Sequence, residues 1–392
     1  MTSMRTQVGI VGAGPAGLML SHLLHLAGVE NVVLEDRSRP YVETRVRAGV
    51  LEQGSVDLLR DSGMGERMLA EGAVHDGVNL QFDGERHRID FAELTGKRIT
   101  VYGQQEVVKD LIAARLAAGG TVCFEVGDVR PEGVTTDDPV IRFSHEGAEH
   151  ELHCDFVAGC DGFHGVCRAV IPAPLRREFA KEYPFAWLGV LAQVAPSTDE
   201  LIYAYHERGF ALHSMRSPEL SRLYVQVHPD EELSAWPDER IWDELRLRLA
   251  SPGFTLHEGP LVERSIATMR SFVCEPMQHG RLFLAGDAAH IVPPTGAKGM
   301  NLALADVAVL ARALAAWFDR GDREPLDSYS PTCLQRVWRV QDFSMLMTEL
   351  MHRLDDTDPF AAGVQRARQR YLASSAAMRT TIAENYVGLP IG

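Results

Sequence analysis

The first forty residues change from an apolar run to small residues and then to a helical pattern. Residues 7–11 (QVGIV) are an apolar run typical of a buried strand, and GAGPAG follows at 12–17. Residues 18–27 continue as an apolar helix, and a second apolar run at 31–34 ends at Glu35. This order predicts a strand, a glycine turn, a helix and a second strand.

The same signal recurs twice further along the chain. Residues 154–162 (CDFVAGCDG) have the pattern of a buried strand that ends at Asp161, and residues 282–285 (LFLA) form another that leads to Asp287. A loop rich in Pro and Gly then precedes an Ala-rich helical run at 302–318. These signals predict a nucleotide-binding domain whose parts are separated in the sequence.

A different pattern occupies the middle of the chain. Four apolar-aromatic or alternating segments, separated by turn residues, predict an antiparallel sheet of its own. They are residues 185–194, 200–205, 209–215 and 222–227. After Asp306 the remaining apolar stripes have helical spacing, which predicts a helical C-terminal region.

Composition indicates a soluble enzyme. The chain has 392 residues, 45% of them hydrophobic and 24% charged, and a net charge of -15 that argues against nucleic acid or an anionic membrane as partner. Its six cysteines and fifteen histidines form no CxxC, HExxH or zinc spacing, so no metal is expected. No signal peptide pattern opens the chain and Arg312 interrupts the longest later apolar run, so we expect a cytoplasmic location and no membrane association.

The glycines and carboxylates suit a dinucleotide. Gly12 permits the tight turn, Gly14 lets the backbone approach a pyrophosphate, and Gly17 lets the helix pack on the strand. Glu35 follows about twenty residues later, where a carboxylate binds ribose hydroxyls. Asp287 can bind a polyol hydroxyl, and the helix start after it favours a flavin that becomes negative on reduction.

Together these segments resemble the FAD-dependent aromatic hydroxylases over nearly the whole chain. The resemblance implies an α/β fold with an FAD-binding, GxGxxG Rossmann-like domain, an inserted antiparallel-sheet substrate domain and a helical C-terminal region. We expect FAD binding at 1–182, with about 76–100 leaning to the substrate side, the substrate sheet at 183–269, and a 270–392 segment whose GD motif completes the FAD site. The motifs are GAGPAG with Glu35, RxRAGVLEQG at 45–54, VYGQ at 101–104, CDG at 160–162, RSFVCEPMQHGRLFLAGDAAH at 270–290, PPTGAKGMN at 293–301 and AENYVGLP at 383–390.

The FAD ligands that the resemblance implies are a ribose carboxylate, two flavin-side arginines, a diphosphate-side glutamine, a ribityl carboxylate and two backbone contacts to the isoalloxazine. In that order they are Glu35, Arg45 with Arg47, Gln104, Asp287, and Met300 with Asn301. The expected cofactor site also includes Gly12, Gly14, Ala16, Gly17 and Asp161.

On the substrate side, the resemblance points to a carboxylate anchor. Arg216 can bind a carboxylate through two charge-assisted hydrogen bonds, with the hydroxyls of Ser214 and Tyr224 beside it. A spacing of two places Ser214 and Arg216 on one strand face, although an ordinary alternating surface strand has the same spacing. The expected substrate site is Tyr203, Ser214, Met215, Arg216, Tyr224 and Pro294.

The other end of the substrate must be activated. A phenol with a pKa near 10 is only about 0.1% ionised at pH 7, so full activation must supply roughly 4 kcal/mol. The resemblance implies that Tyr203 accepts the phenol proton while passing its own to Tyr386, and that His75 releases it to solvent. Lys298 would add positive potential near the flavin loop. Ordinary core aromatics and a surface imidazole are the alternative interpretation.

The implied activity is hydroxylation of 4-hydroxybenzoate at C3 to 3,4-dihydroxybenzoate with O2, through a flavin C4a-hydroperoxide. The alternatives are a hydroxylase of 3-hydroxybenzoate or 4-aminobenzoate, and an FAD-dependent reductase or dehydrogenase. Asp36 replaces the basic residue expected to bind a 2′-phosphate, so we expect NADPH use with tolerance of NADH. Relatives are usually homodimers, and we expect the same here. The expected nicotinamide-cofactor contacts are Arg37, Tyr41, His164 and Arg270.

Overall fold

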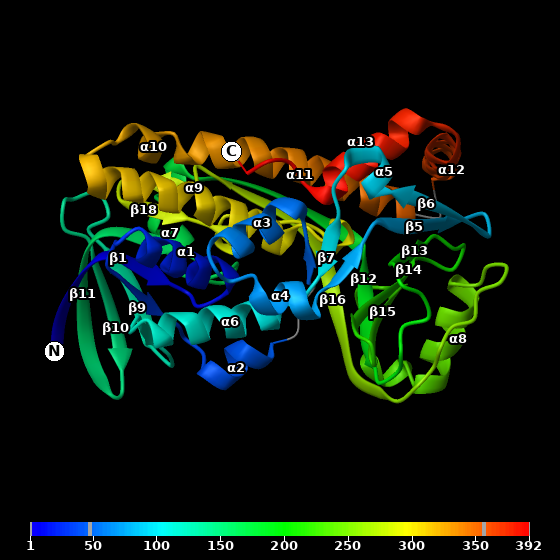
Figure 1. Ribbon diagram of the computed structural model, residues 1–392, viewed down its shortest axis with the longest axis horizontal. Helices are drawn as coiled ribbons and strands as arrows, with labels where there is room; N and C mark the ends of the chain where they lie inside the picture. Colours follow the sequence, from blue (N-terminus) through cyan, green and yellow to red (C-terminus); the bar gives the residue numbers. More distant parts are fainter. Residues whose placement is uncertain (1, 46–48, 355–357, 392) are drawn as a thin grey trace.

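The computed structural model describes residues 2–45, 49–354 and 358–391, which form an elongated molecule (Figure 1). One end contains a largely parallel sheet, the other end contains an antiparallel sheet, and long helices run along one side of both. The expected α/β fold with an additional antiparallel sheet is therefore present.

The first sheet is parallel around its central strand, β1, which pairs with β2 on one side and β11 on the other. Because parallel neighbours end at the same edge, the turns that follow β1, β2, β11 and β18 lie together. Antiparallel strands extend this sheet at β9, β10 and β17. The strands are β1 (Thr2–Val11), β2 (Asn31–Leu34), β8 (Thr121–Cys123), β9 (Gly127–Glu132), β10 (Val140–His145), β11 (Ala148–Gly159), β17 (Gln278–His279) and β18 (Leu282–Leu284).

Three helices, α1 (Pro15–Leu26), α6 (Gln104–Ala117) and α9 (Gly299–Arg320), pack with this sheet. Proline in the first turn of α1 lacks only an N–H that no helical carbonyl would have bonded. Among the described residues, α9 is the one helix long and apolar enough to cross a membrane, yet 72% of that apolar stretch is buried in the protein. Such burial is typical of a core helix.

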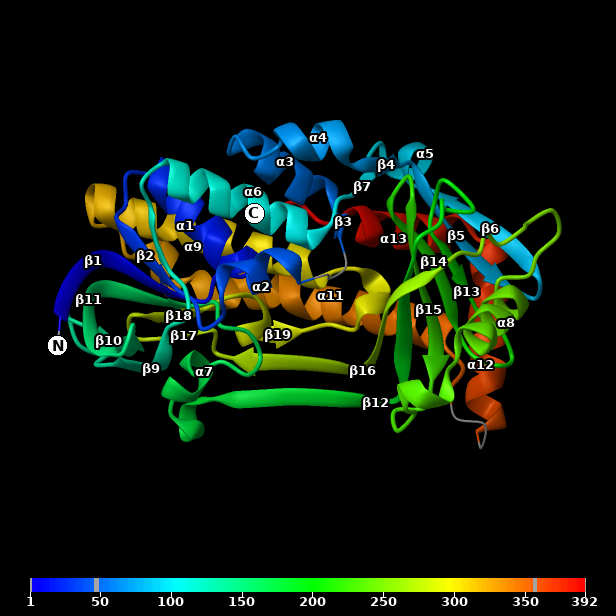
Figure 2. The same cartoon turned by 90° about the horizontal axis from the view of Figure 1, so that it is seen from below.

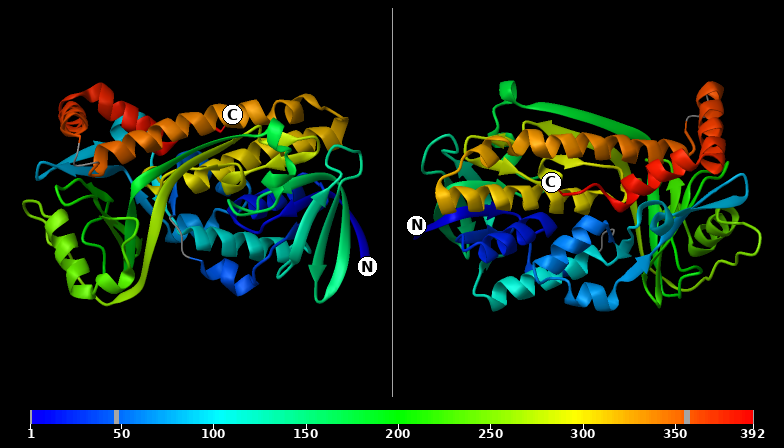
Figure 3. Two further views of the ribbon diagram at one scale, coloured as in Figure 1. Left: turned by 180° about the vertical axis from the view of Figure 1, so that it is seen from behind. Right: turned by 45° about the horizontal axis from the view of Figure 1, so that its top comes forward.

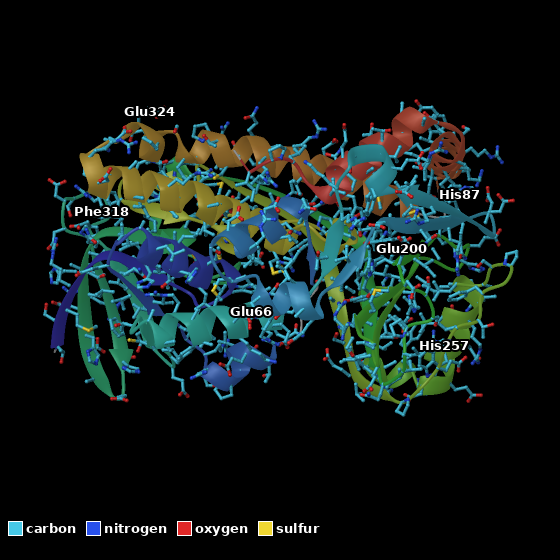
Figure 4. All side chains as sticks on the ribbon, viewed as in Figure 1. Glu66, His87, Glu200, His257, Phe318 and Glu324 are labelled. Atoms are coloured by element: carbon cyan, nitrogen blue, oxygen red, sulfur yellow. The ribbon has the colours of Figure 1, made fainter. Side chains whose placement is uncertain are left out.

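The second sheet has the order β19, β16, β12, β15, β14, β13, β5, β6. Two of its strands, β5 and β6, come from residues 77–90. Glu200, labelled in Figure 4, forms a 2.7 Å ion pair with Arg88 of β6, next to the β5–β13 pairing. The strands are β5 (Gly77–Phe82), β6 (Glu85–Asp90), β12 (Arg177–Ala192), β13 (Ile202–Ala204), β14 (Ala211–Ser217), β15 (Leu220–Val227), β16 (Leu261–Glu275) and β19 (His290–Ile291).

Two long strands join the ends of the molecule. β12 and β16 pair from Arg177 with Glu275 to Ala192 with Leu261, and Figure 2 shows them running side by side along the molecule. Both therefore continue through the expected boundaries at 182/183 and 269/270. The three-part domain division stays a prediction, because no chain break or linker marks those boundaries.

The C-terminal region is helical, as its pattern predicts, and its long helix α11 covers both ends of the molecule (Figure 3). Phe343, Met347, Leu350 and Met351 of α11 pack into the same core as the face of the second sheet that carries Tyr203. A small third sheet contains β3 (Val50–Leu51), β4 (Ala73–His75) and β7 (Ile99–Val101). The remaining helices are α2 (Arg39–Thr44), α3 (Gln53–Asp61), α4 (Glu66–Glu71), α5 (Phe91–Thr95), α7 (Cys167–Val170), α8 (Asp238–Arg248), α10 (Glu324–Asp327), α11 (Tyr329–Met351), α12 (Pro359–Ser374) and α13 (Ala376–Val387).

Candidate active site

The turn after β1 is built from close backbone contacts. Gly12 has a φ of 105°, and a Cβ there would lie 2.3 Å from the carbonyl oxygen of Cys160. A Cβ on Gly17 would lie 1.9 Å from the carbonyl oxygen of Gly12. Gly14 differs, because its Cβ would meet no protein atom within 4 Å. The turn is therefore closely packed against protein at Gly12 and Gly17. It is open at Gly14, where a pyrophosphate could approach the protein backbone.

Glu35 lies beneath this turn, where a ribose ligand was expected. Its carboxylate accepts the N–H of Ala13 (2.6 Å) and the N–H of Arg37 (3.0 Å). Burial, followed by the neighbouring Asp36, raises the pKa of Glu35 to about 7 although the two backbone hydrogen bonds oppose the shift. The carboxylate is thus held rigidly at the carboxyl edge of the sheet.

Asp161 joins the same edge from the end of β11. One carboxylate oxygen accepts the N–H of Cys167 at 2.8 Å, and the other is buried with no hydrogen-bond partner among the described residues. Burial raises the pKa of Asp161. A buried, unpaired oxygen at a nucleotide-type edge is suited to a ligand hydroxyl or amide.

The turn after β18 completes this edge. A Cβ on Gly286 would approach the Cβ atoms of Ala303 (3.2 Å) and Ala16 (3.4 Å), so the turn lies against the first turns of α9 and α1. Asp287 follows with an exposed side chain. This edge thus combines open space over Gly14, the Glu35 carboxylate and the starts of two helices. Such a site fits a dinucleotide with a polyol chain, which is the composition of FAD.

A buried ion pair supports the Gly286 turn. One carboxylate oxygen of Asp306 accepts the Gly286 N–H (2.9 Å) and lies 2.6 Å from Nε2 of His290. Burial alone would lower the pKa of His290, but the Asp306 carboxylate outweighs it and the pKa is raised. The His290–Asp306 pair therefore holds a backbone amide of the turn in place.

The first turn of α9 is fixed to residues 50–52 by the side chain of Asn301. The Asn301 side chain accepts the N–H of Glu52 and donates to the carbonyl of Val50, both at 2.9 Å. Met300 beside it is buried. Because the Asn301 amide is occupied, only backbone atoms of this turn remain for a flavin ring, as the resemblance implies.

The other predicted cofactor residues are placed less tightly. Gln104 is the first residue of α6 and partly buried, and Arg45 is exposed at the end of α2. Arg47 lies outside the described residues.

Strand register places the predicted substrate residues on one face of the second sheet. Tyr203 pairs with Leu212, Leu212 with Tyr224, and Ser214 with Arg222. Since alternate residues share a face, Tyr203, Tyr224 and Ser214 lie on the same side. Ser214 donates its hydroxyl to the carbonyl of Arg222 (2.8 Å), and the Tyr224 hydroxyl accepts from Nε of Arg222 (3.2 Å).

Arg216 is a cation without a carboxylate. Its guanidinium donates to the carbonyl of Met215 (2.8 Å) and interacts with the Tyr224 hydroxyl, while its buried Nε has no hydrogen-bond partner among the described residues. No described carboxylate lies within ion-pair distance of it, and Glu263 acts on it from further away. Burial lowers the pKa of Arg216, and Tyr224 opposes this. A half-buried guanidinium without an ion-pair partner is suited to an anionic ligand. Met215 is buried and Pro294 is exposed.

Tyr203 and Tyr386 form a buried hydroxyl pair. Their oxygens are 2.7 Å apart, and each side chain is 1% exposed. Burial raises the pKa of both phenols above the ordinary value, although the hydrogen bond from Tyr386 partly opposes this at Tyr203. Both hydroxyls therefore stay protonated at neutral pH and can donate and accept in turn.

His75 is buried at 1% exposure, and both ring nitrogens lack a hydrogen-bond partner within the described parts of the chain. Burial lowers its pKa. The next residue, Asp76, accepts the N–H of Phe91 (2.6 Å), and the Phe91 ring stacks on Tyr386 at 5.0 Å. No described hydrogen bond links His75 to either tyrosine, so its role in proton release stays a prediction.

Lys298 differs from the expectation of a free positive charge. Its ammonium lies 2.6 Å from a carboxylate oxygen of Glu52 and donates to the carbonyl of Tyr386 (2.8 Å). Arg336 binds the other Glu52 oxygen at 3.1 Å. Burial lowers the pKa of Lys298, and Glu52 opposes this. The charge is largely compensated, and Lys298 fixes the backbone of Tyr386.

The expected nicotinamide contacts form two aromatic-cationic groups. The guanidiniums of Arg37 and Arg45 lie 5.6 Å and 5.9 Å from the ring of Tyr41. Arg270 lies 5.1 Å from the ring of Phe163, which also contacts His164 at 5.0 Å. Among the described residues, no three His, Cys, Asp or Glu side chains are placed to hold a metal.

Comparison with known proteins decides the family. The family described as an FAD binding domain matches residues 5–344. This chain belongs to it. The protein is accordingly a flavoprotein that binds FAD, so the predicted cofactor is confirmed, and so is the fold class.

Two relatives and one solved structure define its place. A p-hydroxybenzoate hydroxylase of Acinetobacter baylyi is 50% identical over 392 residues, which cover 100% of this chain and 97% of the relative. A 12-dehydrotetracycline 5-monooxygenase/anhydrotetracycline 6-monooxygenase of Streptomyces rimosus is 27% identical over 92% of this chain and 76% of its own length. The structure of p-nitrophenol 4-monooxygenase from Pseudomonas putida matches with a TM-score of 0.83 at 20% identity, over 98% of this chain and 97% of that one. The similarity to the Pseudomonas structure concerns the fold alone. The family and the relative from Acinetobacter show that the present chain is an FAD-dependent monooxygenase.

Sequence reasoning missed several supporting residues. A Cβ on Gly189 would lie 2.8 Å from the ring of Tyr224, so only glycine lets that ring lie over β12. Glu52 and Asp306 support the site from distant segments, as described above. His290 stands inside the quoted GDAAH motif, so its position was a signal that could have been used.

The two glycines of the β1 turn should separate folding from cofactor binding. Gly17→Ala places a methyl group against the Gly12 carbonyl and should lower the free energy of unfolding by about 3 kcal/mol. Gly14→Ala has no protein neighbour and an extended backbone, so it should leave the unfolding of FAD-free protein nearly unchanged but weaken FAD retention. Urea unfolding and flavin release measure the two effects, and equal destabilisation by both variants would contradict the open side of the turn.

The His290–Asp306 pair predicts a pH-dependent stability. Because the folded-state pKa of His290 is raised above 6.5, the pair stabilises fully below that pH, and the contribution is lost as pH rises through the raised value. The urea midpoint of the wild type should therefore fall as the pH is raised from below 6.5 through the raised pKa of His290. Asp306→Asn should remove this component, whereas equal pH slopes in the two proteins would assign the dependence to other groups.

Proposed function

We propose that this enzyme hydroxylates 4-hydroxybenzoate at C3 to give 3,4-dihydroxybenzoate, using FAD, O2 and reduced nicotinamide. The observation that carries the proposal is the pairing of opposite chemistries on one sheet face. An uncompensated guanidinium, Arg216, lies on the strand next to the one that presents the Tyr203–Tyr386 hydroxyl pair. A benzoic acid with a para hydroxyl carries the matching groups at its two ends.

The relative from Acinetobacter supports this substrate, since its name describes a p-hydroxybenzoate hydroxylase and it is 50% identical over the full chain. The alternatives, 3-hydroxybenzoate and 4-aminobenzoate, would present a displaced hydroxyl or an amine to Tyr203. An FAD-dependent reductase or dehydrogenase would need neither the carboxylate anchor nor the tyrosine pair.

The protein's residues would bind and orient the substrate. Arg216 forms charge-assisted hydrogen bonds to the carboxylate, with Tyr224 beside it. Ser214 lies on the same strand, but its hydroxyl donates its proton to the Arg222 carbonyl, so it offers no proton to the carboxylate in this arrangement. Burial of these groups excludes water and strengthens each interaction.

Tyr203 would act on the phenol. Its oxygen accepts the substrate proton while its own proton moves to Tyr386, 2.7 Å away. Because burial raises the pKa of both tyrosines, neither gives up a proton permanently, and the pair conducts it onward. Bound FAD supplies the oxygen activation, with electrons from the nicotinamide. The residues proposed to hold it are Gly12, Gly14, Ala16, Gly17, Glu35, Arg45, Arg47, Gln104, Asp161, Asp287, Met300 and Asn301.

The homodimer and cytoplasmic location remain part of the proposal. α12 exposes a stripe of Phe360, Val364 and Tyr371, with Phe360 81% exposed, and a self-association through such a surface is consistent with a dimer. Sedimentation of the purified protein measures the mass.

The direct experiment mixes the purified yellow protein with 4-hydroxybenzoate, reduced nicotinamide and air. The expected result is 3,4-dihydroxybenzoate in proportion to the O2 consumed. Parallel reactions with 3-hydroxybenzoate and 4-aminobenzoate should give slower turnover. Substrate oxidation without stoichiometric O2 incorporation would favour a dehydrogenase instead.

Tyr203→Phe should separate binding from chemistry. The variant loses the hydroxyl that accepts the phenol proton, so hydroxylation should fall by about 10²- to 10⁴-fold while Kd for 4-hydroxybenzoate changes little. Product formation and ligand titration measure the two quantities. Tyr386→Phe, which keeps the Tyr203 hydroxyl, should be less severe, and an unchanged product yield in Tyr203→Phe would remove that residue from the role.

Arg216→Ala should weaken 4-hydroxybenzoate binding by about 2–3 kcal/mol, which is roughly 30- to 150-fold in Kd. Phenol, which has no carboxylate, is the matched ligand control and should bind wild type and variant equally. If 4-hydroxybenzoate kept its affinity for the variant, the carboxylate anchor would be elsewhere.

The reductant preference follows from Asp36 and its neighbour Arg37. An exposed Asp36 carboxylate opposes a 2′-phosphate, but it lies 3.5 Å from the Arg37 guanidinium, whose charge attracts one. We expect NADPH to be used with substantial tolerance of NADH. Steady-state kcat/KM for both cofactors checks this, and a preference for NADPH of roughly a thousandfold would contradict it.

A further inference from the structure

The wall between the two ends of the proposed substrate site contains one indole. Trp187 of β12 is 3% exposed, and its ring lies 4.8 Å from that of Tyr224 and 5.2 Å from that of Phe210. Phe210 in turn lies 6.0 Å from Tyr203. Trp187 therefore connects the carboxylate end of the face with the hydroxyl end.

The indole N–H has a single, fully buried acceptor. Trp187 Nε1 donates to Nε2 of His352 at 2.7 Å, and His352 is 0% exposed at the end of α11. The other ring nitrogen, Nδ1, donates to the carbonyl of Thr348 at 2.9 Å. These two partners set the tautomer, because Nδ1 carries the hydrogen and Nε2 is left bare to accept. Burial lowers the pKa of His352 to about 3, so the ring stays neutral.

The His352 ring cannot turn easily. It stacks on Phe185 at 4.5 Å with an 11° angle between planes, and on Phe210 at 4.3 Å with 27°. The Thr348 hydroxyl lies 3.0 Å from that of Thr295, which follows Pro294 in the 293–301 segment. A continuous series of contacts thus joins the indole to the segment that precedes and begins α9.

We propose that His352 is a positioning residue that sets the orientation of Trp187 and thereby selects how the aromatic ring of the substrate lies between Arg216 and Tyr203. This inference rests on the proposed function and adds a specificity determinant to the same site. Apolar packing alone would accept several indole orientations, but a buried N–H needs an acceptor, and His352 offers one in a single orientation.

A purely structural role for His352 makes a different prediction. In that case replacing His352 would lower thermal stability without acting through Trp187. Replacing another buried histidine near this face would then have the same effect on Tm and on KM. His213 is the matched control, since it is also 0% exposed and accepts a hydrogen bond, from the Ser197 N–H at 3.0 Å. It lies on β14 with its side chain on the opposite face from Ser214.

The experiment uses FAD-loaded enzyme and the variants His352→Phe, His352→Gln, Trp187→Phe, the double variant His352→Phe/Trp187→Phe, and His213→Phe. The measurements are KM for 4-hydroxybenzoate, kcat, product formed per nicotinamide oxidised, and Tm. His352→Phe should raise KM by roughly tenfold and lower the product ratio, with a smaller change in kcat. His352→Gln, whose amide oxygen can accept from the indole, should recover part of the loss.

Coupling between the two residues decides the outcome. In the Trp187→Phe background no indole N–H remains, so adding His352→Phe should change KM by less than about twofold. His213→Phe should lower Tm but leave KM and the product ratio near wild type. Additive effects in the double variant, an unchanged KM in His352→Phe, or an equal KM rise in His213→Phe would overturn the proposal. A wild type that forms no dihydroxybenzoate contradicts the proposed function and this inference with it, whereas normal wild-type turnover with any of those results overturns the inference alone.

Discussion

The paired strands β12 and β16 are the constraint on which the site depends. Their antiparallel pairing extends from Arg177 and Glu275 to Ala192 and Leu261, with register shifts after Glu182 and after Leu191, so the same two strands belong to both ends of the molecule. Backbone pairing on both sides of the first shift fixes the register of each part. The face of the second sheet that carries Tyr203 is therefore tied to the nucleotide-type edge, and α11 packs along the same direction (Figure 3).

Charge within the buried region is arranged unevenly. Two cationic groups are compensated, His290 by Asp306 and Lys298 by Glu52, and both pairs also hold a backbone group of a functional segment. Arg216 alone among these has no carboxylate partner in the described chain. Because a cation partly removed from water is unfavourable without a nearby counter-ion, Arg216 is suited to an anionic ligand, whereas the two paired cations fix backbone groups.

The Tyr203–Tyr386 end of the same face contains neutral groups instead. Burial keeps Tyr203 and Tyr386 protonated, and His352 unprotonated, over the working pH range. Neutral donors and acceptors can exchange a proton without creating a net charge in a low-dielectric space, where an isolated charge is costly. Lys298 contributes by holding the Tyr386 carbonyl rather than through a free field, because Glu52 lies 2.6 Å from its ammonium.

The sequence by itself determined what depends on neighbours in the chain: the strand, glycine turn and helix at 7–27, the acidic ends at Glu35, Asp161 and Asp287, and the strands that carry Tyr203 and Ser214. These follow from local steric rules and from periods of 2 and 3.6 residues. Only the tertiary structure decided the Trp187–His352 and Glu52–Lys298 contacts, whose partners are 165 and 246 residues apart in the sequence. It also decided that β5 and β6 pair within the second sheet and that β12 continues through the expected boundary at 182/183. Such contacts depend on which surfaces pack together, and a single sequence pattern contains no information on the partner.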